Sequence, residues 1–221
     1  MIKTIVLDIG NVLASFDVVG YLKEKGYSDE FIKRLCKSTV ENELWREIDR
    51  SDSDIIDEPL IAGFIALDTE IAAEVRTFLM NSYEIVKEYD YASEFVLSLK
   101  NGGYKVYLLS NYGKANFKYA KDSFDFFKHV DGGVISYETG YVKPEVGIFE
   151  TFVSKYKIDP KEAVFLDDMK VNIVAASDFG FNTIHFRNIN QAIEELNVLG
   201  VKVNINYQTQ QMKASKAHLN K

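Results

Sequence analysis

Cysteine and histidine are scarce in this chain of 221 residues, which contains one Cys and three His. The single cysteine, Cys36, excludes an internal disulfide and is typical of a reducing compartment. It lies in an amphipathic run, where we interpret it as a packed thiol rather than a nucleophile. The histidines, His129, His185 and His218, lack the spacing of metal ligands, so a histidine-based metal centre is not expected.

The chain also has fewer positive than negative residues and lacks long apolar runs. Lys and Arg number 26 against 33 Asp and Glu, and the net charge is −7. A duplex-binding protein is expected to carry a basic face, so nucleic acid is not an expected partner. The longest apolar run, Leu60 to Leu67, is interrupted by Gly63 and is much shorter than the ~18 residues that a membrane helix requires. Asp8 falls where a signal peptide needs apolar residues, and we therefore expect a cytoplasmic protein without membrane contact.

The apolar residues that are present predict an α/β fold. Short β-branched or aromatic runs bounded by polar residues lie at Ile5–Leu7, Val106–Leu109, Val164–Leu166 and Thr183–Phe186, with a weaker run at Gly133–Ile135. Because these runs are continuous rather than alternating, we expect strands that are buried on both faces. Helical apolar patterns lie between them, at 91–99, at 149–156 and from 171 onward. Alternation of strand and helix predicts a doubly wound parallel sheet.

The stretch from residue 18 to residue 89 departs from this alternation and shows no convincing strand. It predicts helices at Asp29–Ser38, Glu41–Arg50, Asp54–Ala66 and Thr69–Ser82, the last with Asp68 as its N-cap. We therefore expect a helical cap domain at 18–89, inserted after the first strand of a core domain that comprises 1–17 and 90–203. Residues 204–221 are polar and predict a loose C-terminal tail.

Polar side chains follow the predicted strands. The strand ends carry Asp8, Ser110–Asn111 and Asp167–Asp168, and the loop before the last of these carries Lys143. In an open α/β sheet, ligands bind beyond the carboxyl ends of the strands, so these groups should meet at one edge. Crowded carboxylates repel one another, and a divalent cation together with a lysine would relieve that repulsion. Hard oxygen ligands of this kind suit Mg²⁺.

This set of groups matches the requirements of phosphoryl transfer, which needs a nucleophile, a metal, a cation and hydrogen-bond donors. Asp8 could attack phosphorus and form an aspartyl phosphate. Mg²⁺ could then bridge Asp8, the carbonyl of Gly10, Asp168 and the phosphate.

The remaining groups suit the phosphate itself. Ser110 and the backbone amides near Asn111 could donate to phosphate oxygens, and Lys143 could neutralise the charge of Asp8 and the phosphate. Tyr112 and Lys114 are candidates for the entrance of such a site.

These segments, in this order, resemble the motifs of the haloacid dehalogenase-like (HAD) superfamily. They are residues 5–13 (IVLDIGNVL), 108–111 (LLSN), 143–149 (KPEVGIF) and 164–168 (VFLDD), with Asn172 four residues after Asp168. The resemblance extends from about Ile2 to Phe186. It implies a Rossmann-like core and a helical cap over the active site.

The resemblance also implies site roles. It places the nucleophile at Asp8, the phosphate contacts at Ser110 and Lys143, and a Mg²⁺ ligand at Asp168. Asp167 is then a further acidic contact, and Asn172 a partner of these groups rather than a direct ligand.

The chain departs from the family pattern at Gly10. The usual first motif is D-x-D, and its second Asp protonates the leaving group; this sequence has no local replacement for that acid. The form D-x-G-N-V is similar to a branch that includes α-D-glucose-1-phosphate phosphatases. An anomeric hydroxyl is more acidic than an ordinary alcohol, so its departure depends less on a general acid. We therefore expect a Mg²⁺-dependent phosphatase acting on a small phosphorylated metabolite, such as the sugar phosphate glucose 1-phosphate.

Other functions remain open at this stage. A haloacid dehalogenase would also use an Asp nucleophile without the second Asp of the first motif, although its fourth motif lacks paired acids such as Asp167–Asp168. A catalytically silent binding or regulatory protein is a further alternative. A phosphomutase would need acid–base help that Gly10 does not provide.

Overall fold

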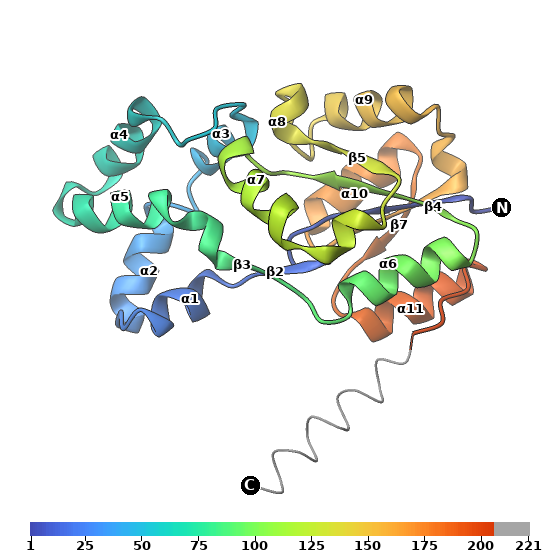
Figure 1. The fold of residues 1–221 in the computed structure, drawn as a ribbon. Coiled ribbons are helices and arrows are strands. Elements are labelled where there is room, and N and C mark those ends of the chain that lie inside the picture. Colours follow the sequence, from blue (N-terminus) through green and yellow to red (C-terminus); the bar gives the residue numbers. More distant parts are fainter. Residues whose placement is uncertain (206–221) are drawn as a thin grey trace, which may run out of the picture.

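A computed structural model describes residues 1–205 of the chain (Figure 1). The strands are β1 (Thr4–Leu7), β2 (Ala14–Phe16), β3 (Val86–Glu88), β4 (Lys105–Ser110), β5 (Gly132–Ile135), β6 (Ala163–Asp167) and β7 (Asn182–His185). The helices are α1 (Val18–Glu24), α2 (Asp29–Lys37), α3 (Trp45–Arg50), α4 (Glu58–Leu67), α5 (Ala72–Met80), α6 (Ala92–Asn101), α7 (Lys114–Ser123), α8 (Ser136–Thr139), α9 (Val146–Tyr156), α10 (Lys170–Phe179) and α11 (Ile189–Val198). The tail predicted at 204–221 lies outside the described residues from residue 206 onward.

The centre of the fold is a five-stranded parallel sheet in the order β5-β4-β1-β6-β7. Successive side chains of β1 enter different hydrophobic clusters, because neighbours along a strand point to opposite faces. Ile5 and Leu7 pack with residues of α6, α7 and α11, whereas Val6 packs with residues of α9 and α10. The sheet is thus covered by helices on both faces, which confirms the predicted α/β fold class.

The order of the strands creates a switch point at β1. The chain passes from β1 to β4 on one side of it, and β6 lies on the other side. Loops that leave the carboxyl ends of β1, β4 and β6 therefore diverge and leave a crevice, which is the usual ligand position in open α/β sheets.

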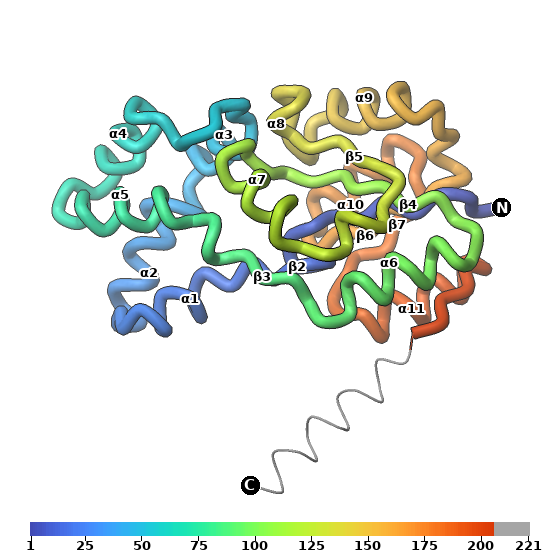
Figure 2. Tube along the Cα trace, viewed as in Figure 1, coloured from blue at the N-terminus to red at the C-terminus, as the bar shows by residue number. Residues whose placement is uncertain are grey.

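Residues 18–85 form a helical insert with a hydrophobic cluster of its own. Its buried members include Leu35, Phe64 and Leu79, and Trp45 packs against this cluster. The figures show α1, α2, α4 and α5 to one side of the sheet (Figures 1 and 2). Among the described residues, no helix combines the length and the apolar character needed to cross a membrane.

The sequence prediction that residues 18–89 contain no strand is wrong at one place. Residues Val86–Glu88 form β3, which pairs antiparallel with β2 where the chain leaves and re-enters the core (Figure 2). Three residues are too few for a periodic pattern to reveal a strand, and this one depends on its partner β2.

Two predicted helices of the insert begin later than expected. The helix predicted from Glu41 begins at Trp45, because i to i+3 hydrogen bonds such as Asn42 N–H to Thr39 C=O form turns before it. The helix predicted from Asp54 begins at Glu58, where the Asp57 carboxylate accepts a hydrogen bond from the Leu60 N–H at 3.0 Å. Asp68, predicted as the N-cap of a helix from Thr69, caps a short 3-10 turn at Thr69–Ile71 that leads into α5, and its carboxylate accepts from the Glu70 N–H.

A close approach between β4 and β5 gives a prediction about stability. A Cβ atom added to Gly133 would lie 2.8 Å from the Leu108 Cβ and 2.9 Å from the Leu108 O, whereas one added to Gly63 in α4 meets only Leu44 at 3.7 Å. Gly133→Ala should lower the free energy of unfolding by about 1–3 kcal/mol through overpacking. Gly63→Ala is the matched control and should raise it slightly, since Ala is favoured over Gly inside a helix. Urea unfolding measures both, and equal effects would contradict this account of the sheet.

Candidate active site

The carboxyl ends of β1 and β6 place two acids on either side of a buried lysine. The Lys143 Nζ lies 2.9 Å from the Asp8 Oδ1 and 2.6 Å from the Asp167 Oδ2. Lys143 is 3% exposed, Asp8 7% and Asp167 0%. Breaking a buried charge pair of this kind is costly, because the remaining charge is left without compensation. The three groups therefore constrain one another.

Asp167 is held by further donors. Its Oδ1 accepts from the Met169 N–H at 2.7 Å, and the Asn172 side-chain amide lies 3.1 Å from both carboxylate oxygens. The partner role expected of Asn172 is thus directed at Asp167. With Lys143 included, the Asp167 carboxylate is saturated by donors inside the protein, and its orientation is fixed.

Asn111 lines the cavity, and its side chain hydrogen-bonds to the backbone of Lys143. Its side-chain amide accepts from the Lys143 N–H at 2.7 Å and donates to the Lys143 C=O at 3.0 Å. This reciprocal pair ties the loop after β4 to the loop that carries the lysine. Ser110, at the end of β4, is 1% exposed and hydrogen-bonds to Asp8.

Asp168 lies at the mouth of the cluster and is fixed by Asn11, a residue that sequence reasoning did not single out. The Asn11 Nδ2 donates to the Asp168 Oδ2 at 2.9 Å, and the Asn11 Oδ1 accepts from the Phe16 N–H at 3.0 Å. Asn11 has a φ of 53°, a left-handed conformation that asparagine tolerates better than most residues. In the sequence, the signal that could have identified Asn11 as a site residue is its position directly after Gly10.

The acidic cluster carries more carboxylates than cationic groups. Carboxylate oxygens of Asp8, Asp167 and Asp168 lie within 4.8 Å of one another, and within the described residues 1–205 their ion pairs are those that Lys143 makes with Asp8 and Asp167. Burial raises the pKa of Asp8 to about 7 even though Lys143 opposes the shift. Burial also raises the pKa of Asp168. Hard oxygen donors with an unbalanced negative charge fit a divalent cation such as Mg²⁺.

The cluster opens into a cavity of about 280 Å³ between the core and the helical insert. From the core it is lined by Asp8, Gly10, Ser110 and Asp168, and from the insert by Trp45, Asp49 and Ser82, among others. Burial raises the pKa of Asp49 to about 7, and the charge of Asp8 adds to the rise. Asp49 was missed from the sequence, because nothing in its local pattern shows that α3 approaches the sheet.

The other residues considered from the sequence lie in different places. Tyr112 lines the cavity, whereas Lys114 pairs with Asp54 at 3.3 Å on the insert. His185 contacts the Asp168 carbonyl through its Nε2 at 2.8 Å, behind the acidic cluster. His218 lies outside the described residues.

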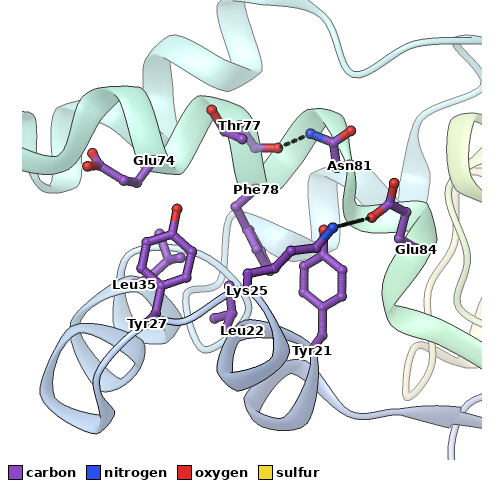
Figure 3. A pocket seen from close by; sticks show the side chains of 10 residues that line it. All are labelled: Tyr21, Leu22, Lys25, Tyr27, Leu35, Glu74, Thr77, Phe78, Asn81 and Glu84. Carbon is purple, nitrogen blue, oxygen red and sulfur yellow. Dashed lines mark hydrogen bonds and ion pairs between the residues drawn. The ribbon is translucent and has the colours of Figure 1, made fainter.

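A second hollow, of about 330 Å³, lies within the insert between α1, α2 and α5 (Figure 3). Its Lys25 and Tyr21 both donate to Glu84, each at 3.1 Å. These polar groups hydrogen-bond to one another. The cavity lined by Asp8 and Asp168, where acids lie next to a buried lysine, is therefore the candidate active site.

The fold and the site together indicate the class of the protein. It is an α/β enzyme whose acidic cluster lies at the switch point of a parallel sheet. Residues 2–180 match the haloacid dehalogenase-like hydrolase family, and the chain belongs to that family. The family match includes β1, β4, β5 and β6 of the sheet and the helical insert, and it ends before β7.

Curated relatives of the chain have diverse functions. The chain is 23% identical over 204 residues to drimenol cyclase drtB of Aspergillus calidoustus, a match that covers 90% of this chain and 37% of the relative. It is 28% identical to D-ribitol-5-phosphate phosphatase of Bacteroides thetaiotaomicron (48% and 54% covered) and 25% identical to (S)-2-haloacid dehalogenase 4A of Burkholderia cepacia (59% and 56% covered). The chain spans between 12% and 37% of the length of the first four curated relatives.

Solved structures agree with the fold. A HAD family enzyme of Bacteroides thetaiotaomicron, in complex with magnesium and inorganic phosphate, superposes with a TM-score of 0.64 at 22% identity. The match covers 85% of this chain and 95% of that chain. At this identity, the likeness bears on the fold alone.

The buried lysine gives a prediction. Lys143→Met removes the positive partner of Asp8 and Asp167, and should lower the free energy of unfolding by about 3–5 kcal/mol. Lys23→Met is the matched control: Lys23 is half-exposed and its Nζ lies 2.9 Å from the Asp29 Oδ1, so its loss should cost about 1 kcal/mol or less. Denaturant unfolding with EDTA present measures both variants. A loss for Lys143→Met no larger than that of the control would show that the buried triad does not stabilise the fold.

Proposed function

We propose that this chain is a Mg²⁺-dependent phosphatase that hydrolyses a small phosphomonoester through an aspartyl phosphate on Asp8. The observation that carries this proposal is that Asp8 and Asp168 line one cavity while the buried Lys143 contacts Asp8. A phosphate dianion requires positive charge around it, and an acidic cluster without a cation would repel it.

The chain's own residues take the following roles in the proposal. The Asp8 carboxylate attacks phosphorus and the bond to the leaving oxygen breaks. Lys143, fixed by Asp167 and Asn111, neutralises charge on the nucleophile and on the phosphate. Ser110 and neighbouring backbone amides donate to phosphate oxygens.

The metal ligands in the proposal are oxygen donors of the same edge. Asp8, Asp168 and the carbonyl of Gly10 would hold Mg²⁺. Asp167, expected as a further acidic contact, has both oxygens occupied by protein donors and would act through its charge on Lys143. The ion would supply charge neutralisation at the transferring phosphoryl group. Asn11, which donates to Asp168, would keep that ligand in place.

The helical insert serves as a cap in this proposal, and the cavity beneath it selects the substrate. Its volume, about 280 Å³, suits a metabolite smaller than a typical drug molecule. The lining joins the aromatic ring of Trp45 to polar groups such as Ser82 and Asn116, a combination that suits a sugar or polyol. Sugar phosphates such as glucose 1-phosphate are the proposed class, and the relative that acts on D-ribitol 5-phosphate supports it.

A haloacid dehalogenase is the second candidate, favoured by the relative of that name. It would use the same nucleophile on carbon instead of phosphorus. The adjacent acids Asp167 and Asp168 favour the phosphatase. They suit a divalent cation, which a monoanionic haloacid does not need. A catalytically silent protein would retain the cluster without turnover.

Hydrolysis assays test the proposal. p-Nitrophenyl phosphate and a panel of sugar phosphates should be turned over with Mg²⁺ and not with EDTA. Asp8→Asn should remove turnover, because the amide cannot attack phosphorus, and circular dichroism checks that the variant is folded. Folded wild-type protein that hydrolyses no phosphate with Mg²⁺, but releases halide from 2-haloacids, would replace the phosphatase with the dehalogenase.

A further inference from the structure

The departing oxygen of an ordinary alkyl phosphate needs a proton, because an alkoxide is a poor leaving group. A positioned acid typically contributes about 10²–10⁴-fold to such a step. Gly10 offers no side chain, so the donor must come from elsewhere in the cavity. Among the described residues that line the cavity, the carboxyl groups are those of Asp8, Asp49 and Asp168.

Two of these carboxyl groups are already engaged. Asp8 contacts Lys143, and Asp168 accepts a hydrogen bond from Asn11. The Asp49 carboxyl differs, since it makes no hydrogen bond or ion pair with any residue in the described range 1–205. It is a partly buried acid on the insert side of the cavity, and the charge of the nucleophile Asp8 acts on it.

The surroundings of Asp49 favour its protonated form. Burial raises its pKa to about 7, and the charge of Asp8 pushes in the same direction. Lys143 and Arg50 oppose the shift without cancelling it. Close by, the hydroxyl of Tyr112 is buried and has no partner among the described residues, and the charge of Asp49 acts on it.

The backbone of Asp49 is anchored to the core. The Ser136 hydroxyl donates to the Asp49 C=O at 2.6 Å and accepts from the Tyr112 N–H at 2.8 Å. Next along the chain, Arg50 donates to the Glu145 carboxylate at 2.9 Å and to the Gly140 C=O at 2.7 Å.

The end of α3 also packs directly on the loop after β4. A Cβ atom added to Gly113 would lie 2.1 Å from the Ile48 O, so the two backbones touch. The Lys114 N–H then donates to the Ser51 C=O at 3.0 Å. These contacts hold the segment around Asp49 at the cavity, as general acid catalysis requires.

We propose that Asp49, carried by the helical insert, is the catalytic residue that protonates the leaving oxygen. This inference rests on the proposed phosphatase function. As Asp8 bonds to phosphorus and the phosphorus–oxygen bond breaks, the Asp49 carboxyl gives its proton to the departing oxygen, which leaves as an alcohol. Water then attacks the aspartyl phosphate and passes a proton to the Asp49 carboxylate, which restores both acids.

Asp49→Asn tests the proposal through its dependence on the leaving group. An alkyl phosphate such as glycerol phosphate should lose about 100-fold or more in kcat/KM, the size of a general-acid contribution. The loss on p-nitrophenyl phosphate should be at least ten times smaller, because p-nitrophenolate departs without a proton. Asp52→Asn is the matched control: Asp52 is an exposed acid three residues away that does not line the cavity, and its replacement should leave both rates unchanged.

A rescue variant adds a second arm. A Cβ atom added to Gly10 meets nothing within 4 Å, so the first atom of an aspartate side chain causes no clash there. Gly10→Asp combined with Asp49→Asn should restore alkyl phosphate hydrolysis at least about 10-fold over Asp49→Asn, and Gly10→Ala in the same background should not.

The outcomes separate this inference from the function on which it rests. Equal losses on alkyl and aryl phosphates, or no loss on either, would overturn the role of Asp49 while leaving the phosphatase in place. Wild-type protein that hydrolyses neither substrate with Mg²⁺ would instead overturn the phosphatase itself, and the role of Asp49 with it.

Discussion

The ion pairs of Lys143 with Asp8 and Asp167 are the interaction on which the rest of the site depends. A lysine buried this deeply is stable as a cation only if negative groups surround it. Burial alone would lower its pKa, but the charges of Asp167 and Asp8 outweigh burial and raise the pKa above its ordinary value. The same lysine limits how far burial raises the pKa of Asp8. The two acids thus keep Lys143 a cation, and its charge in turn opposes the effect of burial on Asp8.

The architecture explains how three distant segments meet at this lysine. Because β1 and β6 are neighbours in a parallel sheet, the acids at their carboxyl ends are brought side by side. The loop of Lys143 reaches them from the side of β5, and Asn111 at the end of β4 ties it down. The crevice at the switch point is left for substrate, with the helical insert above it. Anchors at Ser136, Arg50 and Gly113 then bring α3 close enough to supply a side chain to the same cavity.

The sequence predicted the sheet well and the insert less well, for a physical reason. The four apolar runs match β1, β4, β6 and β7 to within one residue at each end, because a strand buried on both faces must be apolar throughout. Strand ends in a parallel sheet share one edge, so Asp8, Ser110 and Asp167 could be placed together from their positions in the sequence alone. β3 could not be predicted, because its existence depends on pairing with β2 rather than on its own residues.

Asn11 and Asp49 show the other limit of sequence reasoning. Asn11 is recognised only when its side chain is seen to join Asp168 to the backbone of Phe16. Asp49 reaches the cavity only because α3 packs on the core, a tertiary contact that no local spacing encodes. The family resemblance identified the residues at the sheet edge, and the packing of the insert brought the additional acid.

The central claim is that Asp8 carries the phosphoryl group during turnover, and trapping that intermediate tests it most directly. The protein would be mixed with Mg²⁺ and its best phosphate substrate, quenched in acid during turnover, digested and examined by mass spectrometry. The account predicts a phosphoryl group on the peptide that contains Asp8, absent from the Asp8→Asn variant. Phosphate release with Asp8 never modified, or a phosphoryl group on a different residue, would contradict it.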